Sequence, residues 1–314
     1  MKKIKNYLVK ASLCLMVVIF LSSISQAESV GRTVGLTIDQ SNAPRANALG
    51  DAFSAVTGDI AALNFNPASL AGLLGTQLSL QRKQGAFDEN YSQVAVGSEF
   101  FGGVFGATAN LYDSGSATLW DGYNPPKTVT AQKDLLVNFG YGRTIGIFDI
   151  GANLRYLSTE LAEEKKAVGE TVELGVNLPL YQKFRLSAVG TIFANDLTYY
   201  EQSEKLPKIY RVGGSYESIL TMGSYQVPFL CLVDVKYSET EDRLSESIGL
   251  ESRVIDSLAL RLGYKFNQGL QGFTVGFGFF VREFSFDYSF GLISENELDP
   301  LQAFGLSMRF GNKD

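Results

Sequence analysis

Alternation of apolar and polar residues is strongest near the C-terminus of the chain. From Phe273 to Val281 and from Phe284 to Phe290, aromatic and aliphatic residues occupy every second position, and the residues between them are mostly small, polar or charged. This period of two is typical of a β-strand whose faces meet different surroundings. A face of rings opposite a face of small and polar residues predicts a barrel strand with lipid outside and a lumen inside.

The same alternation recurs along most of the chain and predicts fourteen strands. Most have about ten residues, the length that crosses a bilayer when the strand is tilted. The predicted strands are residues 76–84, 90–100, 103–112, 132–141, 146–158, 169–178, 183–193, 208–217, 225–238, 243–252, 256–266, 271–281, 283–291 and 301–310. Short connections alternate with longer polar ones, as at the two ends of an antiparallel barrel. We therefore predict an all-β fold, a transmembrane antiparallel β-barrel of about 14 strands, over residues 75–314.

A secreted β-sandwich is the alternative for the same strands. It would bury the rings between two facing sheets and leave the charged row in water. In lipid, an open sheet would leave unpaired backbone groups at its edges, so we expect the sheet to close.

The first 27 residues carry the features of a secretory signal peptide. Four lysines precede the apolar run ASLCLMVVIFL, and the Ser-Gln-Ala sequence at 25–27 fits a small-x-small cleavage site. We expect a mature chain that begins at Glu28, and a retained membrane anchor is the alternative. Cleavage removes four of the 27 basic residues and none of the 33 acidic ones, which leaves an acidic mature chain.

Composition argues against several classes of function. An acidic chain lacks the basic footprint that nucleic acid requires. Without histidine, and with Cys231 as the only cysteine of the mature chain, internal disulfides are impossible and the usual metal ligands and proton shuttles are missing. We therefore predict no catalytic residues, no metal site and no cofactor, and a protein that is not an enzyme.

Residues 28–74 follow a different pattern. The stretch from Pro44 to Val56 is rich in alanine with helical spacing, and residues 59–63 fit a further turn. Asn66 precedes a proline, which displaces it from the α region, so we expect the helical part to end there. A fourteen-stranded barrel is wide enough to need a filler. We therefore predict that residues 28–74 form a small helical plug in the lumen.

The plug region also carries a family resemblance. Residues 44–73, PRANALGDAFSAVTGDIAALNFNPASLAGL, resemble the N-terminal signature of the PorV/PorQ family of outer-membrane proteins and, more distantly, FadL-type outer-membrane transporters of hydrophobic compounds. The plug-motif residues are Arg45, Phe53, Asn66, Pro67 and Ala68. The chain departs from such barrels in one respect, because four residues follow the aromatic Phe310.

Two functional hypotheses follow from this resemblance. The FadL-type resemblance implies passive uptake of fatty-acid-like molecules past a plug and through an opening in the wall of a barrel in the outer membrane of a Gram-negative-type cell. The PorV-type resemblance implies a component of a protein secretion or surface-attachment system, whose long loops engage a protein partner. In both cases the outer surface meets outer-membrane lipid.

Glycine and proline mark candidate positions for a wall opening. Gly102, Gly103 and Gly106 crowd the third predicted strand, and Pro228 interrupts the ninth. Such residues often mark a bulge or a broken ladder. An ordinary distortion near a turn is the alternative.

Some residues predicted to face the lumen are apolar. A hydrophobic ligand track would use them, and packing against Leu49, Phe53 and Val56 of the plug is the alternative. The predicted track residues are Leu136, Phe193, Leu230, Leu232 and Phe280, with Val189 beside them. Charged residues of the same row are expected to pair across the lumen or to tether the plug, namely Asp149, Arg155, Asp234, Lys236, Arg261 and Lys265.

Overall fold

The computed structural model describes residues 35–311, except for 86–88, 121, 124, 163–164, 182, 200–201, 223–224, 268–271 and 293–299. The predicted signal peptide, residues 1–27, and residues 28–34 of the predicted plug segment lie outside the described residues.

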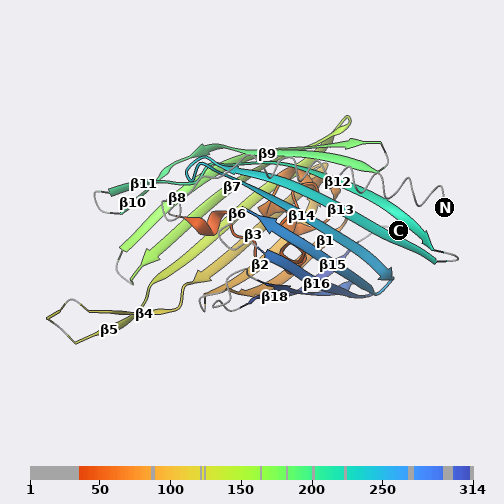
Figure 1. Ribbon diagram of the computed structural model, residues 1–314. Helices are drawn as coiled ribbons and strands as arrows, with labels where there is room; N and C mark the ends of the chain where they lie inside the picture. Colours follow the sequence, from red (N-terminus) through yellow and green to blue (C-terminus); the bar gives the residue numbers. More distant parts are fainter. Residues whose placement is uncertain are drawn as a thin grey trace.

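Fourteen strands close into one antiparallel barrel in this described part of the chain (Figure 1). They are β1 (Thr76–Gln84), β2 (Asn90–Phe100), β3 (Gly103–Asp113), β6 (Gln132–Ile145), β7 (Phe148–Leu161), β8 (Lys165–Leu180), β9 (Phe184–Ala194), β12 (Ile209–Met222), β13 (Tyr225–Ser238), β14 (Arg243–Ile255), β15 (Leu258–Phe266), β16 (Gly272–Val281), β17 (Phe284–Gly291) and β18 (Leu301–Phe310). β1 pairs with β18, from Thr76 opposite Phe310 to Gln84 opposite Gln302, and this pairing closes the sheet. The predicted all-β barrel is therefore confirmed.

The two ends of the barrel differ in their connections. At one end, called the short-turn end here, two-residue turns at 101–102, 146–147, 256–257 and 282–283 join consecutive strands. The other end, called the long-loop end, carries two small hairpins that the alternation did not predict. These hairpins are β4 (Ser116–Leu119) with β5 (Lys127–Thr130), and β10 (Asp196–Tyr199) with β11 (Gln202–Lys205). They extend beyond the barrel wall at the left of Figure 1.

The apolar row of the strands lies on the outside of the barrel. Side chains from Phe273 through Phe286 that belong to this row are exposed, and Phe273 is 55% exposed. A sandwich would have buried these rings between sheets, so that alternative is excluded. An apolar outer surface of this extent is the arrangement expected where a barrel meets lipid. No helix among the described residues has the length and apolarity to cross a membrane.

The N-terminal segment occupies the lumen, as predicted (the orange part of Figure 1). It contains η1 (Leu36–Ile38), α2 (Pro44–Ala48), η2 (Ile60–Asn64) and η3 (Pro67–Gly72). We call residues 35–74 the plug.

The plug contains less α-helix than its alanine content predicts. The helix expected over 44–56 ends at Ala48, because Gly50 and Asp51 take positive φ values of 65° and 62° and turn the chain. A side chain at Gly50 would also meet the backbone N of Tyr264 at 2.8 Å. The wall therefore fixes the place where the helix ends.

Asn66 lies in extended backbone between two 3-10 helices, with φ of −157° and ψ of 112°. Its side chain accepts a hydrogen bond from Ala68 N at 3.0 Å, and Pro67 occupies the first position of η3. Asn is a preferred N-cap, and proline suits the first helical position. The prediction that the preceding helical part ends before Pro67 is therefore confirmed, since η2 ends at Asn64, and Asn66 also begins the separate 3-10 helix η3.

Candidate functional site

The plug is tied to the wall by a chain of ion pairs that begins at Arg45 of α2. Its guanidinium donates to Glu251 of β14 at 2.9 and 2.7 Å and to Asp59 of the plug at 3.0 Å. Glu251 also accepts from Arg261 Nε at 2.5 Å, and Arg261 donates to Asp287 at 2.6 Å. Burial opposes the charge of Arg45, but Glu251 and Asp59 outweigh it and raise the pKa of Arg45 above its ordinary value. We call these five residues the Arg45 network.

Two further carboxylates of the plug pair with cations of the wall. Asp39 accepts from Arg211 and Lys236, each at 2.5 Å. Asp51 accepts from Lys265. Burial alone would raise the pKa of Asp39, but the charges of Lys236 and Arg211 outweigh it and hold this pKa below its usual value. Burial likewise opposes the charge of Asp51, and Lys265 lowers the pKa of Asp51.

Asp234 of β13 binds the middle of the plug. Its carboxylate accepts from Phe53 N at 3.0 Å, Ser54 N at 2.9 Å and Ser54 Oγ at 2.7 Å. Buried backbone N–H groups require a hydrogen-bond acceptor. For Phe53 and Ser54 this acceptor is a side chain of the barrel wall.

Arg155 of β7 performs the same task for two plug carbonyls. It donates to the carbonyl oxygens of Ile38 at 2.5 Å and Asn64 at 3.0 Å, and it pairs with Glu173 at 2.6 Å. The predicted tethering role is thus confirmed for Arg155, Asp234, Lys236 and Lys265. Two members of the predicted row bind elsewhere: Arg261 pairs with acids of the wall, and Asp149 accepts from Thr144 Oγ1 at 2.7 Å.

The Asn-Pro-Ala part of the motif fixes the plug to itself and to β8. Asn66 donates to Ser54 O at 3.2 Å and to Asn177 Oδ1 at 2.9 Å. Asn66, Pro67 and Ala68 are all buried. The motif therefore has a structural role, because it holds two parts of the plug together and attaches the plug to β8.

Phe53 forms the centre of the plug core. Its ring is fully buried, lies 5.3 Å from the ring of Phe65, and is covered by the guanidinium of Arg45 at 5.6 Å. Leu49 and Val56 belong to the same buried cluster.

A belt of glycines lets the plug approach the wall. A side chain at Gly106 of β3 would lie 2.9 Å from Ile60 Cδ1 and 3.1 Å from Leu70 Cδ2 of the plug. Neighbouring strands place further glycines beside it, since Gly97 pairs with Gly106 and Gly106 pairs with Gly140. We call the wall glycines that face the plug the glycine belt: Gly97, Gly106, Gly140, Gly142, Gly151, Gly175, Gly213, Gly249, Gly263, Gly276 and Gly305.

The glycines of the third strand do not open the wall. The pairing of β2 with β3 runs without a register shift from Phe100 opposite Gly103 to Asn90 opposite Asp113, and the pairing of β3 with β6 is also continuous. Gly102 lies in a two-residue turn with φ of 72°. The prediction of an opening at Gly102, Gly103 and Gly106 is therefore wrong, because Gly102 serves a turn and Gly106 makes room for the plug.

Pro228 does not break the sheet either. It pairs with Ile219 in an unshifted ladder between β12 and β13. The pairs between β13 and β14 begin one residue later, at Phe229 opposite Ser252. The missing donor of Pro228 therefore falls at the rim of the barrel, where it costs no ladder bond.

The predicted apolar track is divided among separate places. Leu232 is 1% exposed and packs in the plug core with Leu49 and Phe53, which is the alternative that the sequence left open. Leu136 is buried in another cluster, with Ile38 and Leu157. Val189 is also buried. Leu230 and Phe280 of the predicted track line an open cavity.

Phe193 lies on the outside of the barrel, so its predicted place in the lumen is wrong. The register between β8 and β9 shifts at Val172 and Glu173, and Phe193 pairs with Val172, a residue of the outer row. Phe193 is accordingly 51% exposed. A bulge adds a residue to one strand and reverses the parity beyond it, which counting along the sequence cannot detect.

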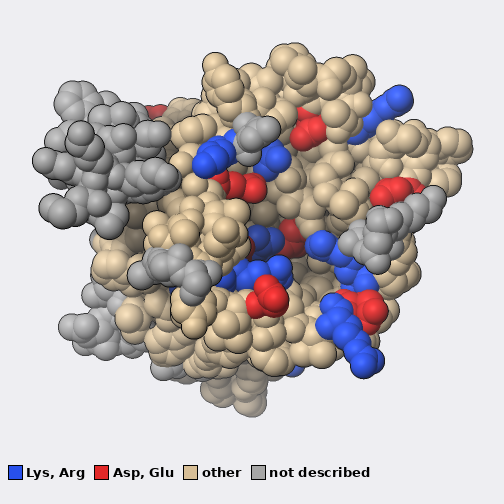
Figure 2. All heavy atoms as spheres, turned by 90° about the vertical axis from the view of Figure 1, so that its right-hand side faces the viewer, with Lys and Arg blue, Asp and Glu red and all other residues tan. Residues whose placement is uncertain are grey.

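A cavity of about 720 Å³ lies below the plug at the short-turn end, and we call it the vestibule. The plug forms its roof through Ala55, Val56, Thr57, Gly58 and Asp59. Figure 2 looks into this end and shows Lys, Arg, Asp and Glu side chains gathered around the hollow. The Arg45 network lines it, together with Lys183, Arg253 and Arg309.

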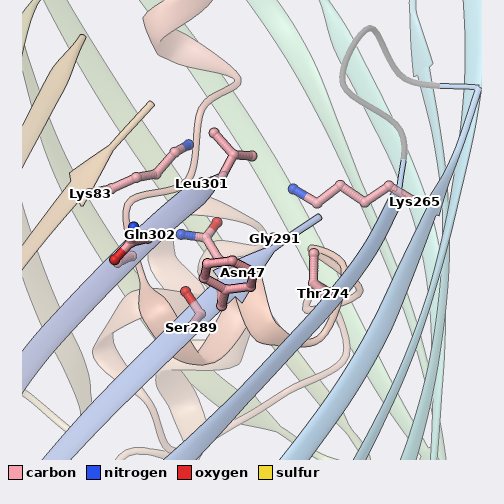
Figure 3. Close-up of a pocket in the computed structure, with 10 residues that line it drawn as sticks. Asn47, Lys83, Lys265, Thr274, Ser289, Gly291, Leu301 and Gln302 are labelled. Carbon is pink, nitrogen blue, oxygen red and sulfur yellow. The ribbon is translucent and has the colours of Figure 1, made fainter. Parts of the chain in front are cut away.

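A small pocket lies on the other side of the plug from the vestibule. A pocket of about 10 Å³ lies there beside Asn47, and Lys83 and Lys265 extend toward one another across it (Figure 3). Such a volume holds about one water molecule. Lys83 donates to Gln40 at 3.2 Å and to Ser41 O at 3.1 Å. The plug itself therefore fills the lumen near this pocket.

Comparisons with models of protein families and with curated proteins find no match. Among solved structures, the fold is similar to that of the Ralstonia pickettii toluene transporter TbuX, with a TM-score of 0.62 and 14% sequence identity over 85% of this chain and 98% of that chain. The Pseudomonas putida toluene transporter TodX is also similar, with a TM-score of 0.57 and 15% identity over 84% of this chain and 97% of that chain. At these identities the likeness concerns the fold.

Proposed function

We propose that this protein is an outer-membrane β-barrel for the passive uptake of small hydrophobic molecules, exported by means of a cleaved signal peptide. The observation that carries the proposal is a closed barrel with an apolar outer surface and its own N-terminal segment seated in the lumen. The fold likeness to two toluene transporters supports it. Diffusion down a gradient needs no cofactor and no chemical step.

The plug core suggests the route. Leu49, Phe53 and Val56 pack against Leu232 of β13, and Leu230 packs at the edge of the same cluster. Val56 and Leu230 also line the vestibule. We call the contact between these three plug residues and Leu232 the seam. A hydrophobic molecule that passes through the seam exchanges one apolar contact for another, so its passage costs little desolvation. The cargo would then reach the vestibule.

Uptake of labelled toluene and oleate by cells with and without the protein tests the proposal. We expect uptake to depend on the protein and to fall when Leu232→Asp places a charge in the seam. Val233→Thr, on the outer row of the same strand, is the control. Each variant must migrate faster on a gel when unheated than when boiled, which shows that the barrel has formed. Equal uptake with and without the protein would contradict the proposal.

A PorV-like role in protein secretion or surface attachment is the second candidate. It is favoured by the filled lumen beside the small pocket and by the β4–β5 and β10–β11 hairpins, which extend from the long-loop end (Figure 1). Under this hypothesis the hairpins engage a protein partner. Deletion of residues 116–130 should then release a co-purified partner and leave uptake of toluene and oleate unchanged. The transport hypothesis predicts that no partner co-purifies with the intact protein.

A further inference from the structure

Arg253 differs from the other arginines that surround the vestibule. Arg45 and Arg261 are both saturated by carboxylates. Arg253 has no ion pair within the described residues, and its guanidinium instead lies over the ring of Phe280, 4.3 Å from the centroid. A guanidinium on an aromatic face keeps its hydrogen-bond donors available at its edges. Arg253 is therefore prepared to bind an anion.

Apolar residues of the neighbouring strands lie close to Arg253 in the vestibule. Arg253 of β14 is paired in register with Ala259 of β15. On the other side, Leu230 of β13 is paired with Glu251, two residues from Arg253. Pro228, Leu230, Ala259 and Phe280 all line the vestibule with Arg253. We call these five residues the Arg253 ledge.

The charges of the vestibule favour an anion at the ledge. Three acids that line the vestibule, Asp59, Glu251 and Asp287, are already paired with arginines of the Arg45 network. Two more cations lie free of carboxylates in the described part of the chain, since Lys183 donates to Ser218 Oγ at 3.4 Å and Arg309 donates to Gly58 O at 2.7 Å.

The remaining acid of the lining, Glu217, lies 3.7 Å from Arg185. Each acid that lines the vestibule therefore has a basic partner, and the basic groups are in excess. An incoming anion meets a positive site without a competing bare carboxylate.

We propose that the Arg253 ledge is a binding site for an amphipathic anion. The anionic head group lies on the guanidinium of Arg253, and the alkyl chain lies along Phe280, Ala259 and Leu230. A volume of about 720 Å³ is in the range of small-molecule sites. The claim that the ledge selects the class of cargo rests on the proposed uptake function. The claim that the ledge binds an amphipathic anion does not depend on that function.

Photolabelling tests the site in the full chain, reconstituted in phosphatidylcholine nanodiscs. The probes are dodecanoate and dodecanol that carry the same diazirine on the chain, and labelled peptides are identified by mass spectrometry. The variants are Arg253→Gln and Arg253→Lys. The matched control is Arg143→Gln, since Arg143 is an exposed residue near the same end of β6 that does not line the vestibule.

We expect dodecanoate to label peptides that contain Leu230 or Phe280 at lower concentration than dodecanol does. Arg253→Gln should weaken dodecanoate labelling about tenfold, as expected for the loss of one charge-assisted hydrogen bond. Arg253→Lys should retain part of the preference, and Arg143→Gln should retain all of it. Equal labelling by both probes, or labelling that Arg253→Gln leaves unchanged, would overturn the proposal.

Two further arms separate the possible sources and the possible failures. Competition by added phosphatidylglycerol identifies a membrane lipid as the occupant, whereas competition only by free dodecyl sulfate identifies a soluble amphiphile; both results support the site. Uptake assays on the same variants separate the two proposals. Absence of uptake for every compound, with Arg253-dependent labelling intact, would reject the transport function and keep the ledge.

Discussion

Arg45 of the plug and Glu251 of β14 are joined by two parallel hydrogen bonds, from Nε to Oε2 at 2.9 Å and from Nη2 to Oε1 at 2.7 Å. Bidentate pairs of this kind are geometrically specific and strong. The two residues are 206 positions apart in the sequence, so the contact locks the front of the chain to a wall strand near its end.

Loss of this pair should loosen the plug. Glu251→Gln leaves two guanidinium groups without their shared carboxylate, and we expect it to destabilise plug seating by about 2 kcal/mol, below the cost for a fully buried pair. Leak conductance in planar bilayers measures the effect and should rise. Glu160→Gln is the control, because Glu160 pairs with an exposed lysine at 3.5 Å. Equal conductance of both variants and the wild type would contradict the prediction.

Asp234 should protect two backbone amides of the plug from hydrogen exchange. It accepts from the N–H groups of Phe53 and Ser54. Asp234→Ala leaves both donors buried without an acceptor, at a cost of about 1–3 kcal/mol each. We expect exchange at residues 53 and 54 to accelerate by at least about tenfold. Ser187→Ala, which removes a neighbouring hydroxyl 2.8 Å from Ser54 Oγ, should leave these two amides protected.

Substitution of a belt glycine that faces the plug backbone should destabilise the plugged barrel. A Cβ at Gly142 would lie 2.8 Å from Pro67 O and 2.9 Å from Ala71 N. Gly142→Ala should therefore destabilise the plugged barrel by about 1–3 kcal/mol through overpacking. The temperature at which the protein loses its compact electrophoretic mobility measures this.

Gly214→Ala on β12 is the matched substitution, because the nearest atom to its Cβ would be Arg185 O at 3.8 Å. We expect no loss of stability there. A fall in the transition temperature as large as that of Gly142→Ala would show that the plug is not the cause.

Acid should release the plug at Asp39. The pKa of this carboxyl is lowered in the folded protein, so its contribution to stability is complete above its ordinary pKa of about 4 and is lost as the pH falls through the lower folded value. Leak conductance should therefore be flat from about pH 7 to 5 and rise below about pH 4.

Asp39→Asn removes this titration and leaves Arg211 and Lys236 without their carboxylate. We expect a higher conductance at neutral pH and a weaker rise in acid. Asp196→Asn, in the β10–β11 hairpin outside the barrel sheet, should follow the wild-type curve. A wild-type curve without any acid-induced rise would reject the role of Asp39.

The barrel is readable from the sequence because its two faces meet different media. β1 and β13 begin and end at the residues that the alternation predicts. Parity fails at Phe193, where a shift between Val172 and Glu173 reverses the faces without changing the composition. The short hairpins at the long-loop end were missed because four-residue strands are too short to establish a period.

The candidate site was only partly predictable. Parity placed Asp234 and Lys265 in the lumen, and the need for a filler placed the plug there. Their partners, Ser54 and Asp51, carry no sequence signal, because nothing local links residues 180 and 214 positions away. Gly106 resembled a weak point in a strand, and its purpose is visible only with Ile60 resting on it.

The glycine belt constrains the order in which the molecule is assembled. The plug touches glycines on strands all around the cylinder, and at several of them one added carbon atom would already collide with the plug. We therefore expect the N-terminal segment to move inward while β1 and β18 are still apart, with the pairing of these two strands as the last step of assembly. A disulfide that staples β1 to β18 early should trap an empty, misassembled cylinder.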